Sequence, residues 1–389
     1  FRWDAWVYTF PLLLEAREQI LSGQMPFWAP SFCNGTPLLA NINAAVFYPP
    51  KFLAYALPLS LGYALFLTLH TWLAIVGMHL LLRKGLSQRV APAVCGALIY
   101  AACGYARGMC DTLNVHALPW IPLGLAALLW VRSPRQRRWA PLLFGLAVLM
   151  LVLGGDIQAL VIFGLVALPA TLMTPRRRHS LRVLILGGVI ALALSAPQWL
   201  PTVFVTTESY RASGIAFSDA TELSFHPMRC VEFWVPHRFG THALWNGEHL
   251  MGQGATKLMP WTASVHIGRL ALALACLAVW RYHRRWDVRW ALGVAVLSLV
   301  LAFGRFMPGF HVWHELPLVG SFRYPEKYLL WTSLGLSLLA AMGVDALCAL
   351  WRKAHAQRAW KVAVVGLAGM VLVGALVTGA EALVVAQAA

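Results

Sequence analysis

Three acidic residues of the sequence have neighbours that suit them to chemistry: Asp4, Asp111 and Asp156. Asp4 stands two residues after Arg2, and a carboxylate there can remove the proton of an attacking hydroxyl group as a general base. The other interpretation of Asp4 is a solvated loop acid beside Arg2. Asp111 shares a short segment with His116, and these two residues could bind an acceptor molecule or assist the base, unless the segment is an ordinary polar loop.

Asp156 and Gln158 follow the pair Gly154-Gly155 inside a long apolar stretch, residues 140–173. A carboxylate near membrane depth costs about 2.5–3.5 kcal/mol on insertion scales unless it is paired or wetted. Asp156 and Gln158 are therefore candidates for substrate binding. The alternative is that Asp156 reaches interfacial water at a turn.

Several basic residues could hold a phosphate group, because the planar guanidinium of arginine matches phosphate geometry. They are Arg211, Arg305, Arg323 and Lys327. Arg323 is the strongest candidate of this set, and Lys327 follows it in the same segment. The alternatives for Arg323 are a salt bridge with Glu326 or Glu315, or contact with lipid headgroups.

Metal and nucleotide chemistry find little support in the sequence. His226, His237, His242 and His249 fall in one segment, but their spacing matches no zinc pattern. The sequence contains no G-x-x-x-x-G-K-[ST] phosphate loop and no pair of cysteines with metal-type spacing. We therefore expect neither a metal ion nor a cofactor.

The composition predicts the elements that must position these residues. Of the 389 residues, 59% are hydrophobic and 12% are charged, against about 25% charged in an average protein. So much apolar surface requires lipid as its solvent. Apolar runs occupy residues 61–82, 90–106, 117–131, 140–155, 157–173, 183–203, 265–280, 290–304, 328–350 and 362–380. The sequence thus predicts an all-α, polytopic integral membrane protein with about ten transmembrane helices, of which 140–155 and 157–173 form a hairpin.

Lys and Arg gather in short clusters between the apolar runs, which is the pattern that orients membrane proteins rather than one that binds nucleic acid, despite a net charge of +16. The clusters are Arg83 to Arg89, Arg132 to Arg138, Arg176 to Arg182, Arg281 to Arg289 and Arg352 to Lys361. We expect these segments to be cytoplasmic. The remaining loops carry most of the carboxylates, so acid-dependent chemistry is expected at the extracytoplasmic face.

Four ranges are predicted along the chain: a first extracytoplasmic loop at 1–52, a transmembrane core at 53–203, a long extracytoplasmic loop at 204–264 and a second transmembrane core at 265–389. Pro11 to Leu21 shows an amphipathic pattern that Gly23 ends, which predicts an interfacial helix on the outer leaflet. The sequence begins at Phe1 without methionine, and we expect a fragment of a longer protein.

A series of short motifs resembles the bacterial YfhO-type membrane proteins, which belong with the GT-C glycosyltransferases. The motifs are Gly35 to Asn41, Phe47 to Pro50, Asn114 to Leu123, Gly154 to Gln158, Ala196 to Pro201 with Ser209 to Arg211, Phe233 to Pro236, Leu301 to Arg305 and Ser321 to Tyr328. The resemblance covers most of the chain in order.

The resemblance implies a GT-C-like fold in the bacterial cytoplasmic (inner) membrane and a sugar donor carried on a polyprenyl phosphate. It also implies an active-site acid in the first outer loop, which here is Asp4, and an envelope polymer, glycolipid or protein as acceptor. Asp4-Ala5 stands where some relatives have two adjacent acids, which argues against a paired-acid or metal-binding role.

Two other functions stay open. A transporter or flippase of lipid-linked sugars would place ionisable residues at mid-bilayer and often shows paired halves, whereas the predicted spans are nearly free of charge and show no repeat. A non-catalytic envelope-assembly protein could share the fold, because fold does not fix function.

Overall fold

The computed structural model describes residues 5–109, 112–130, 134–209, 212, 214–239, 261–262, 264–316 and 319–353. In these ranges the chain is helical with no strands, and an isolated bridge pairs Ala29 with Thr36. The chain divides into two compact units. Unit 1 comprises Phe1–Leu86, Met109–Ala216 and Glu315–Phe322, and unit 2 comprises Ser87–Gly108, Phe217–His314 and Arg323–Ala389.

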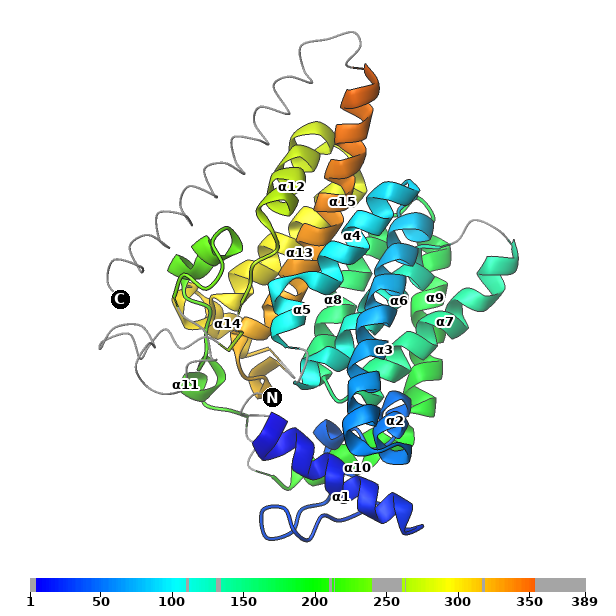
Figure 1. The fold of residues 1–389 in the computed structure, drawn as a ribbon, viewed down its shortest axis with the longest axis vertical. Coiled ribbons are helices and arrows are strands. Elements are labelled where there is room, and N and C mark those ends of the chain that lie inside the picture. Colours follow the sequence, from blue (N-terminus) through cyan, green and yellow to red (C-terminus); the bar gives the residue numbers. More distant parts are fainter. Residues whose placement is uncertain are drawn as a thin grey trace. The chain divides into compact units, whose positions relative to one another are not determined.

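Unit 1 contains the helices that surround the candidate site. They are η1 (Ala5–Thr9), α1 (Phe10–Leu21), η2 (Ile42–Ala44), η3 (Pro49–Lys51), α2 (Phe52–Ala56), α3 (Leu59–Leu80), η4 (Leu81–Gly85), η5 (Leu113–His116), α6 (Ala117–Leu129), α7 (Pro134–Leu153), α8 (Ile157–Met173), α9 (Arg177–Leu194), α10 (Ala196–Thr207) and η12 (Val319–Ser321). Helices α3 and α6 pack side by side, and α7 packs against both α6 and α9 (Figure 1).

Two local predictions in unit 1 are confirmed. A helix, α1, ends one residue before Ser22, and Gly23 follows with φ +75°, a left-handed conformation that suits glycine. The stretch 140–173 forms two helices, α7 and α8, with the turn at Gly154–Asp156. Gly155 has φ +85°, and a Cβ atom there would collide with the carbonyl oxygen of Ile42, so only glycine fits this turn.

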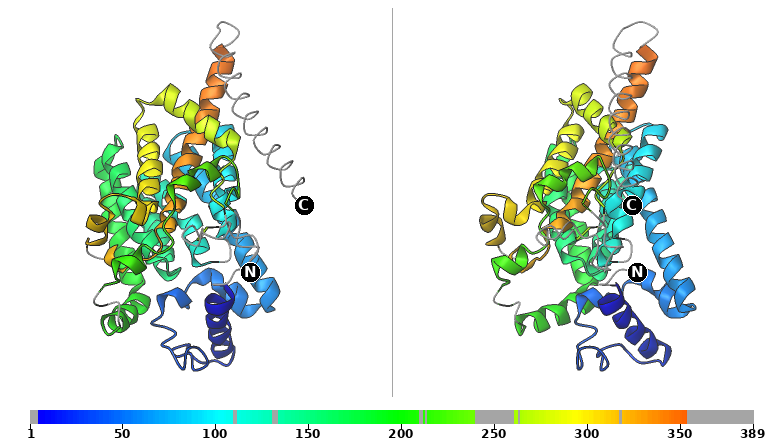
Figure 2. Two further views of the ribbon diagram at one scale, coloured as in Figure 1. Left: turned by 90° about the vertical axis from the view of Figure 1, so that its left-hand side faces the viewer. Right: turned by 60° about the vertical axis from the view of Figure 1, so that its left-hand side comes forward.

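Unit 2 is built around its longest described helix. Its elements are α4 (Val90–Ala102), α5 (Gly104–Gly108), α11 (Phe217–Ala220), η7 (Pro227–Phe233), α12 (Arg269–Tyr282), α13 (Trp286–Ala302), η11 (Gly304–Phe306), α14 (Phe310–His314), η13 (Pro325–Tyr328) and α15 (Leu329–Lys353). Helix α15 packs against α4, α12 and α13, and Figure 2 shows it in orange beside the yellow α13. Gly335 and Gly343 permit this packing, because a side chain at either would meet the backbone of α13 or α12.

The predicted number of spans is wrong. Among the described residues, three helices are long and apolar enough to cross a membrane, or four if a bent pair is one span, instead of about ten. The three are Leu59–Gly85, Val90–Gly108 and Pro325–Arg352, and the bent pair is Arg177–Leu194 with Ala196–Thr207, which turns by 74°. The apolar run 362–380 lies outside the described residues.

The physical reason is helix length. Helices α6, α8 and α13 have 13, 17 and 17 residues. At a rise of 1.5 Å per residue they are roughly 20–26 Å long, shorter than the hydrocarbon core of about 30 Å. Breaks at Ser195 before Pro197 and at Gly154–Asp156 cut the apolar runs, and proline cannot continue a helical hydrogen-bond ladder.

Helices α7, α8 and α9 of unit 1 nevertheless carry large apolar side chains on exposed faces. The side chains recur at helical spacing: Leu142 and Leu146 on α7, Leu165, Leu168 and Leu172 on α8, and Ile185, Val189 and Leu192 on α9. Exposed apolar side chains in such rows are typical of helices that contact a membrane or a partner.

Candidate functional site

A buried lysine that pairs with no carboxylate of the described residues defines the candidate site. Lys51 ends η3, directly after Pro49-Pro50, and its side chain is buried. Its Nζ donates a hydrogen bond of 2.7 Å to the carbonyl oxygen of Ala44. No carboxylate of the described residues forms an ion pair with it. Burial lowers the pKa of Lys51 to about 7, because the charged form loses its hydration.

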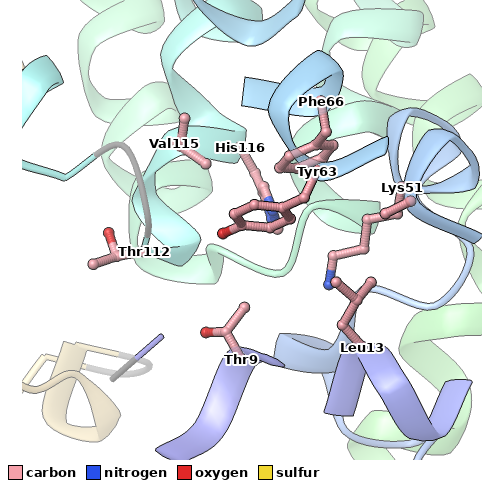
Figure 3. A pocket seen from close by; sticks show the side chains of 9 residues that line it. Thr9, Leu13, Lys51, Tyr63, Phe66, Thr112, Val115 and His116 are labelled. Carbon is pink, nitrogen blue, oxygen red and sulfur yellow. The ribbon is translucent and has the colours of Figure 1, made fainter. Parts of the chain in front are cut away.

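Lys51 lines a small cavity in unit 1. Figure 3 shows its ammonium group and the hydroxyl groups of Thr9, Tyr63 and Thr112 around this space. The full lining is Thr9, Leu13, Lys51, Ala54, Tyr63, Phe66, Thr112, Val115 and His116. The cavity has a volume of about 10 Å³, which is roughly the room that one water molecule needs. One cation and several hydroxyl groups thus meet in a nearly closed space.

His116, a residue predicted from sequence, lines the same cavity. Its Nδ1 lies 2.6 Å from the carbonyl oxygen of Gly154. A carbonyl oxygen can only accept, so Nδ1 carries the hydrogen and Nε2 of the neutral ring is an acceptor. Burial, with a smaller contribution from the charge of Lys51, lowers the pKa of His116 well below its usual value and keeps the ring neutral. The described residues form no hydrogen bond to Nε2.

An aromatic cluster behind the cavity fixes the position of His116. Trp120 Nε1 donates to Tyr48 Oη at 2.6 Å, and Tyr48 Oη lies 2.6 Å from His70 Nε2. His70 Nδ1 donates to the Phe66 carbonyl at 2.7 Å, so His70 Nε2 accepts from the tyrosine. The ring of Tyr48 lies 4.8 Å from that of His116, centroid to centroid. These contacts leave little rotational freedom for the imidazole.

Asp156 and Gln158 belong to the frame of the site. The carboxylate of Asp156 is the N-cap of α8, because Oδ1 accepts from the backbone N–H of Ala159 at 2.9 Å. Its Oδ2 accepts from Asn114 Nδ2, also at 2.9 Å. Asp156 is buried rather than wetted, and Gln158 is buried in the first turn of α8. Asp156 therefore holds the turn whose Gly154 carbonyl orients His116.

Arg323 and Lys327 lie in unit 2, in a group of cations and aromatic rings. Arg323 pairs with Glu222 at 2.9 Å, instead of with Glu326 or Glu315. The rings of Tyr324 and Trp261 stack at 4.8 Å, and Lys327 Nζ lies 5.6 Å from the first and 5.9 Å from the second. The structure thus divides the predicted binding residues between the two units.

Glu326 pairs instead with a different arginine. Arg229 and Glu326 are fully buried and in direct contact, and Arg229 Nε also donates to Glu232 at 2.8 Å. The backbone N–H of Thr262 donates to Glu326 at 2.8 Å. All three charged side chains are thus satisfied within unit 2, which indicates a structural role.

Three predicted site residues, Asp4, Asp111 and Arg211, lie outside the described residues, as do His242 and His249. Asp4 immediately precedes η1, whose Thr9 lines the cavity. In the described part of the chain no three His, Cys, Asp or Glu residues come close enough to hold a metal ion.

Sequence reasoning missed Lys51 and the cluster of Tyr48 and His70. The sequence did carry a signal for Lys51 and Tyr48, because the motif Phe47 to Pro50 contains Tyr48 and directly precedes Lys51. Comparisons of the chain with protein-family models, with curated proteins and with solved structures find no match. The resemblance to YfhO-type proteins therefore stays a prediction from the motifs.

Proposed function

We propose that this protein is a membrane glycosyltransferase that moves a sugar from a polyprenyl-phosphate donor to an extracytoplasmic acceptor of the bacterial envelope, which is a polymer, a glycolipid or a protein. One observation carries the proposal. The ammonium group of Lys51 is buried on a cavity, with no carboxylate of the described residues to neutralise it.

A buried cation is costly unless an opposite charge compensates it. A phosphate group entering the cavity would supply that charge to Lys51. The hydroxyl groups of Thr9, Tyr63 and Thr112 offer donors and acceptors suited to a sugar. Because the cavity has room for about one water molecule, a donor must displace the segment that carries Thr9 and Leu13.

Asp4 is the proposed general base for the acceptor hydroxyl. It precedes η1, and its role comes from the resemblance in the first loop. Arg323 and Lys327 are proposed as further contacts for phosphate or lipid headgroups. The ion pair of Arg323 with Glu222 is partly exposed; such pairs contribute about 0–1 kcal/mol, so a phosphate can compete for this arginine.

The helices that can cross a membrane, and the exposed apolar faces of α7, α8 and α9, support a protein that works beside lipid. A lipid-linked donor would reach such a site from the bilayer. A flippase and a non-catalytic assembly protein remain the alternatives that the experiment must separate.

The test uses the full-length protein in nanodiscs with a labelled polyprenyl-phosphate sugar and envelope extract as acceptor. Lys51→Met should weaken donor binding by about 10-fold or more, since charge-assisted hydrogen bonds contribute about 1.5–3 kcal/mol. Lys84→Met is the matched control, because Lys84 is an exposed lysine of the same unit. Asp4→Asn should leave binding intact and lower product formation by about 10²–10⁴-fold.

Other outcomes would contradict the proposal. Normal donor binding by Lys51→Met would show that Lys51 does not bind the phosphate of the donor. Full turnover by Asp4→Asn would show that Asp4 is not the general base. If the parent protein moves labelled lipid across the bilayer but forms no product with any acceptor, the protein is a flippase. If it does neither, the assembly role is favoured.

A further inference from the structure

We propose that Lys51 and His116 together recognise two adjacent groups of the donor sugar. These are the phosphate ester at C1 and the free hydroxyl group at C2, as in a sugar 1-phosphate. The inference rests on the proposed function and names the class of sugar that the site accepts. Lys51 donates to a phosphate oxygen, and Nε2 of His116 accepts the hydrogen of the hydroxyl group.

The two side chains offer opposite hydrogen-bonding characters in one small space. The ammonium of Lys51 can only donate. The hydrogen bond from Nδ1 to Gly154, at 2.6 Å, makes Nε2 of His116 an acceptor. A ligand that satisfies both must present an acceptor and a donor close together. The phosphate diester of a polyprenyl-phosphate sugar presents only acceptor oxygens, which suit Lys51 and cannot donate to Nε2.

Lys51 on η3 and His116 on η5 are not part of the segment that carries Thr9 and Leu13, so their separation across the cavity sets how close these two groups of the ligand must be. Lys51 and His116 line the same cavity of about 10 Å³, which is roughly the volume available to one water molecule. Two side chains that line so small a space favour ligand groups on adjacent carbons over groups at opposite ends of a sugar ring. The nearest hydroxyl group to an anomeric phosphate is the one at C2.

The surroundings hold His116 in the neutral form that this role requires. The ring is packed against Tyr48 and Phe66, with centroid distances of 4.8 and 5.4 Å. Among the described residues, the titratable groups around it besides Lys51 are His70, Tyr48 and Tyr63. None of these is an anion that would favour an imidazolium. Burial and the nearby ammonium lower the pKa of His116, and the acceptor at Nε2 therefore persists at neutral pH.

Binding of soluble headgroups tests the inference without requiring sugar transfer. The probes are glucose 1-phosphate, 2-deoxyglucose 1-phosphate, inorganic phosphate and methyl glucoside, titrated into the full-length protein in nanodiscs by calorimetry. The parent should bind glucose 1-phosphate about 5- to 10-fold more tightly than the 2-deoxy compound, the effect of one net hydrogen bond in a buried site. Methyl glucoside should bind more weakly than either phosphate ester.

Two substitutions of His116 separate recognition from folding. In His116→Asn the amide Nδ2 can still donate to the Gly154 carbonyl, but the acceptor at Nε2 is lost. This variant should bind both phosphate esters equally, at the affinity the parent has for the 2-deoxy compound. His116→Gln retains an acceptor at the ε position and should keep part of the preference. Lys51→Met should lose affinity for inorganic phosphate and for both esters, and Lys84→Met should match the parent.

The inference is overturned if the parent binds both esters equally, or if His116→Asn keeps the full preference while its thermal unfolding matches that of the parent. A preference for the 2-hydroxyl group in a protein that forms no glycosylated product would leave the ligand assignment standing and refute the transferase. Formation of glycosylated product without any preference for the 2-hydroxyl group would support the transferase and refute the ligand assignment.

Discussion

Asn114 and Asp156 are joined by a hydrogen bond of 2.9 Å from Nδ2 to Oδ2, and the other oxygen of the same carboxylate caps α8. This relationship ties η5, which carries His116, to the turn between α7 and α8. For Asp156 the sequence left two interpretations open, a substrate-binding acid and a turn residue in contact with water. Its contacts in the structure are those of a buried helix cap.

Asp156→Leu should therefore destabilise the protein. Loss of an N-cap costs about 0.5–2 kcal/mol, and a buried amide without its partner, here Asn114, costs about 1–3 kcal/mol more. Asp156→Asn should lose less, because its Oδ1 can still cap α8. Thermal unfolding in detergent measures both variants. A leucine variant as stable as the parent would show that the cap contributes nothing.

Lys51 should make stability depend on pH between about 7 and 10.5. Its pKa is about 7 in the folded protein and 10.5 in the unfolded chain, so within this window the unfolded state binds one proton more. The free energy of unfolding then rises with pH by about 1.4 kcal/mol per unit from this group. The cost of burying Lys51 is fully present below pH 7 and is relieved as the pH approaches 10.5.

Lys51→Met removes this cost, so its gain in stability over the parent should be largest at pH 6–7 and should shrink steadily toward pH 10. Melting temperatures of parent and variant across this range provide the measurement. Lys84 is exposed, so the melting temperature of Lys84→Met should follow that of the parent at every pH. A difference between Lys51→Met and the parent that does not change with pH would mean that Lys51 keeps its ordinary pKa.

Arg229→Met should be among the most damaging single changes in unit 2. It leaves the buried carboxylates of Glu232 and Glu326 without their cation, and breaking a buried pair costs about 3–5 kcal/mol. Arg323→Met breaks the partly exposed pair with Glu222 and is the matched control, with an expected loss of about 1 kcal/mol or less. Denaturant unfolding of the two variants would reveal whether burial makes this difference; similar losses would contradict it.

Val189→Arg tests whether the exposed apolar face of α9 contacts lipid. Val189 lies on α9 and is 62% exposed. In a bilayer an arginine there costs about 2.5–3.5 kcal/mol on insertion scales, so the amount of inserted protein should fall. Gln24→Arg adds the same charge at an exposed residue after α1 and should insert normally. If Val189→Arg inserts as well as Gln24→Arg, this face of α9 lies in water.

The sequence by itself predicted an all-α chain, the break at Gly154–Asp156 and the end of α1 shortly before Gly23. These features depend on apolar periodicity, on proline and on the backbone freedom of glycine, which act within a few residues of the chain. The same local information could not give the number of spans, because whether an apolar run continues as one straight helix depends on bends such as the 74° turn between α9 and α10.

Only the tertiary structure decided which polar residues are buried and what they contact. Lys51 is an ordinary lysine after two prolines until α2, α3 and η1 enclose it. Asp156 caps α8 through the backbone N–H of Ala159, and only the fold brings Asn114, 42 residues away in sequence, to its other carboxylate oxygen. The protonation and the role of a buried group follow from its desolvation and its partners, and both are set by segments far apart in the chain.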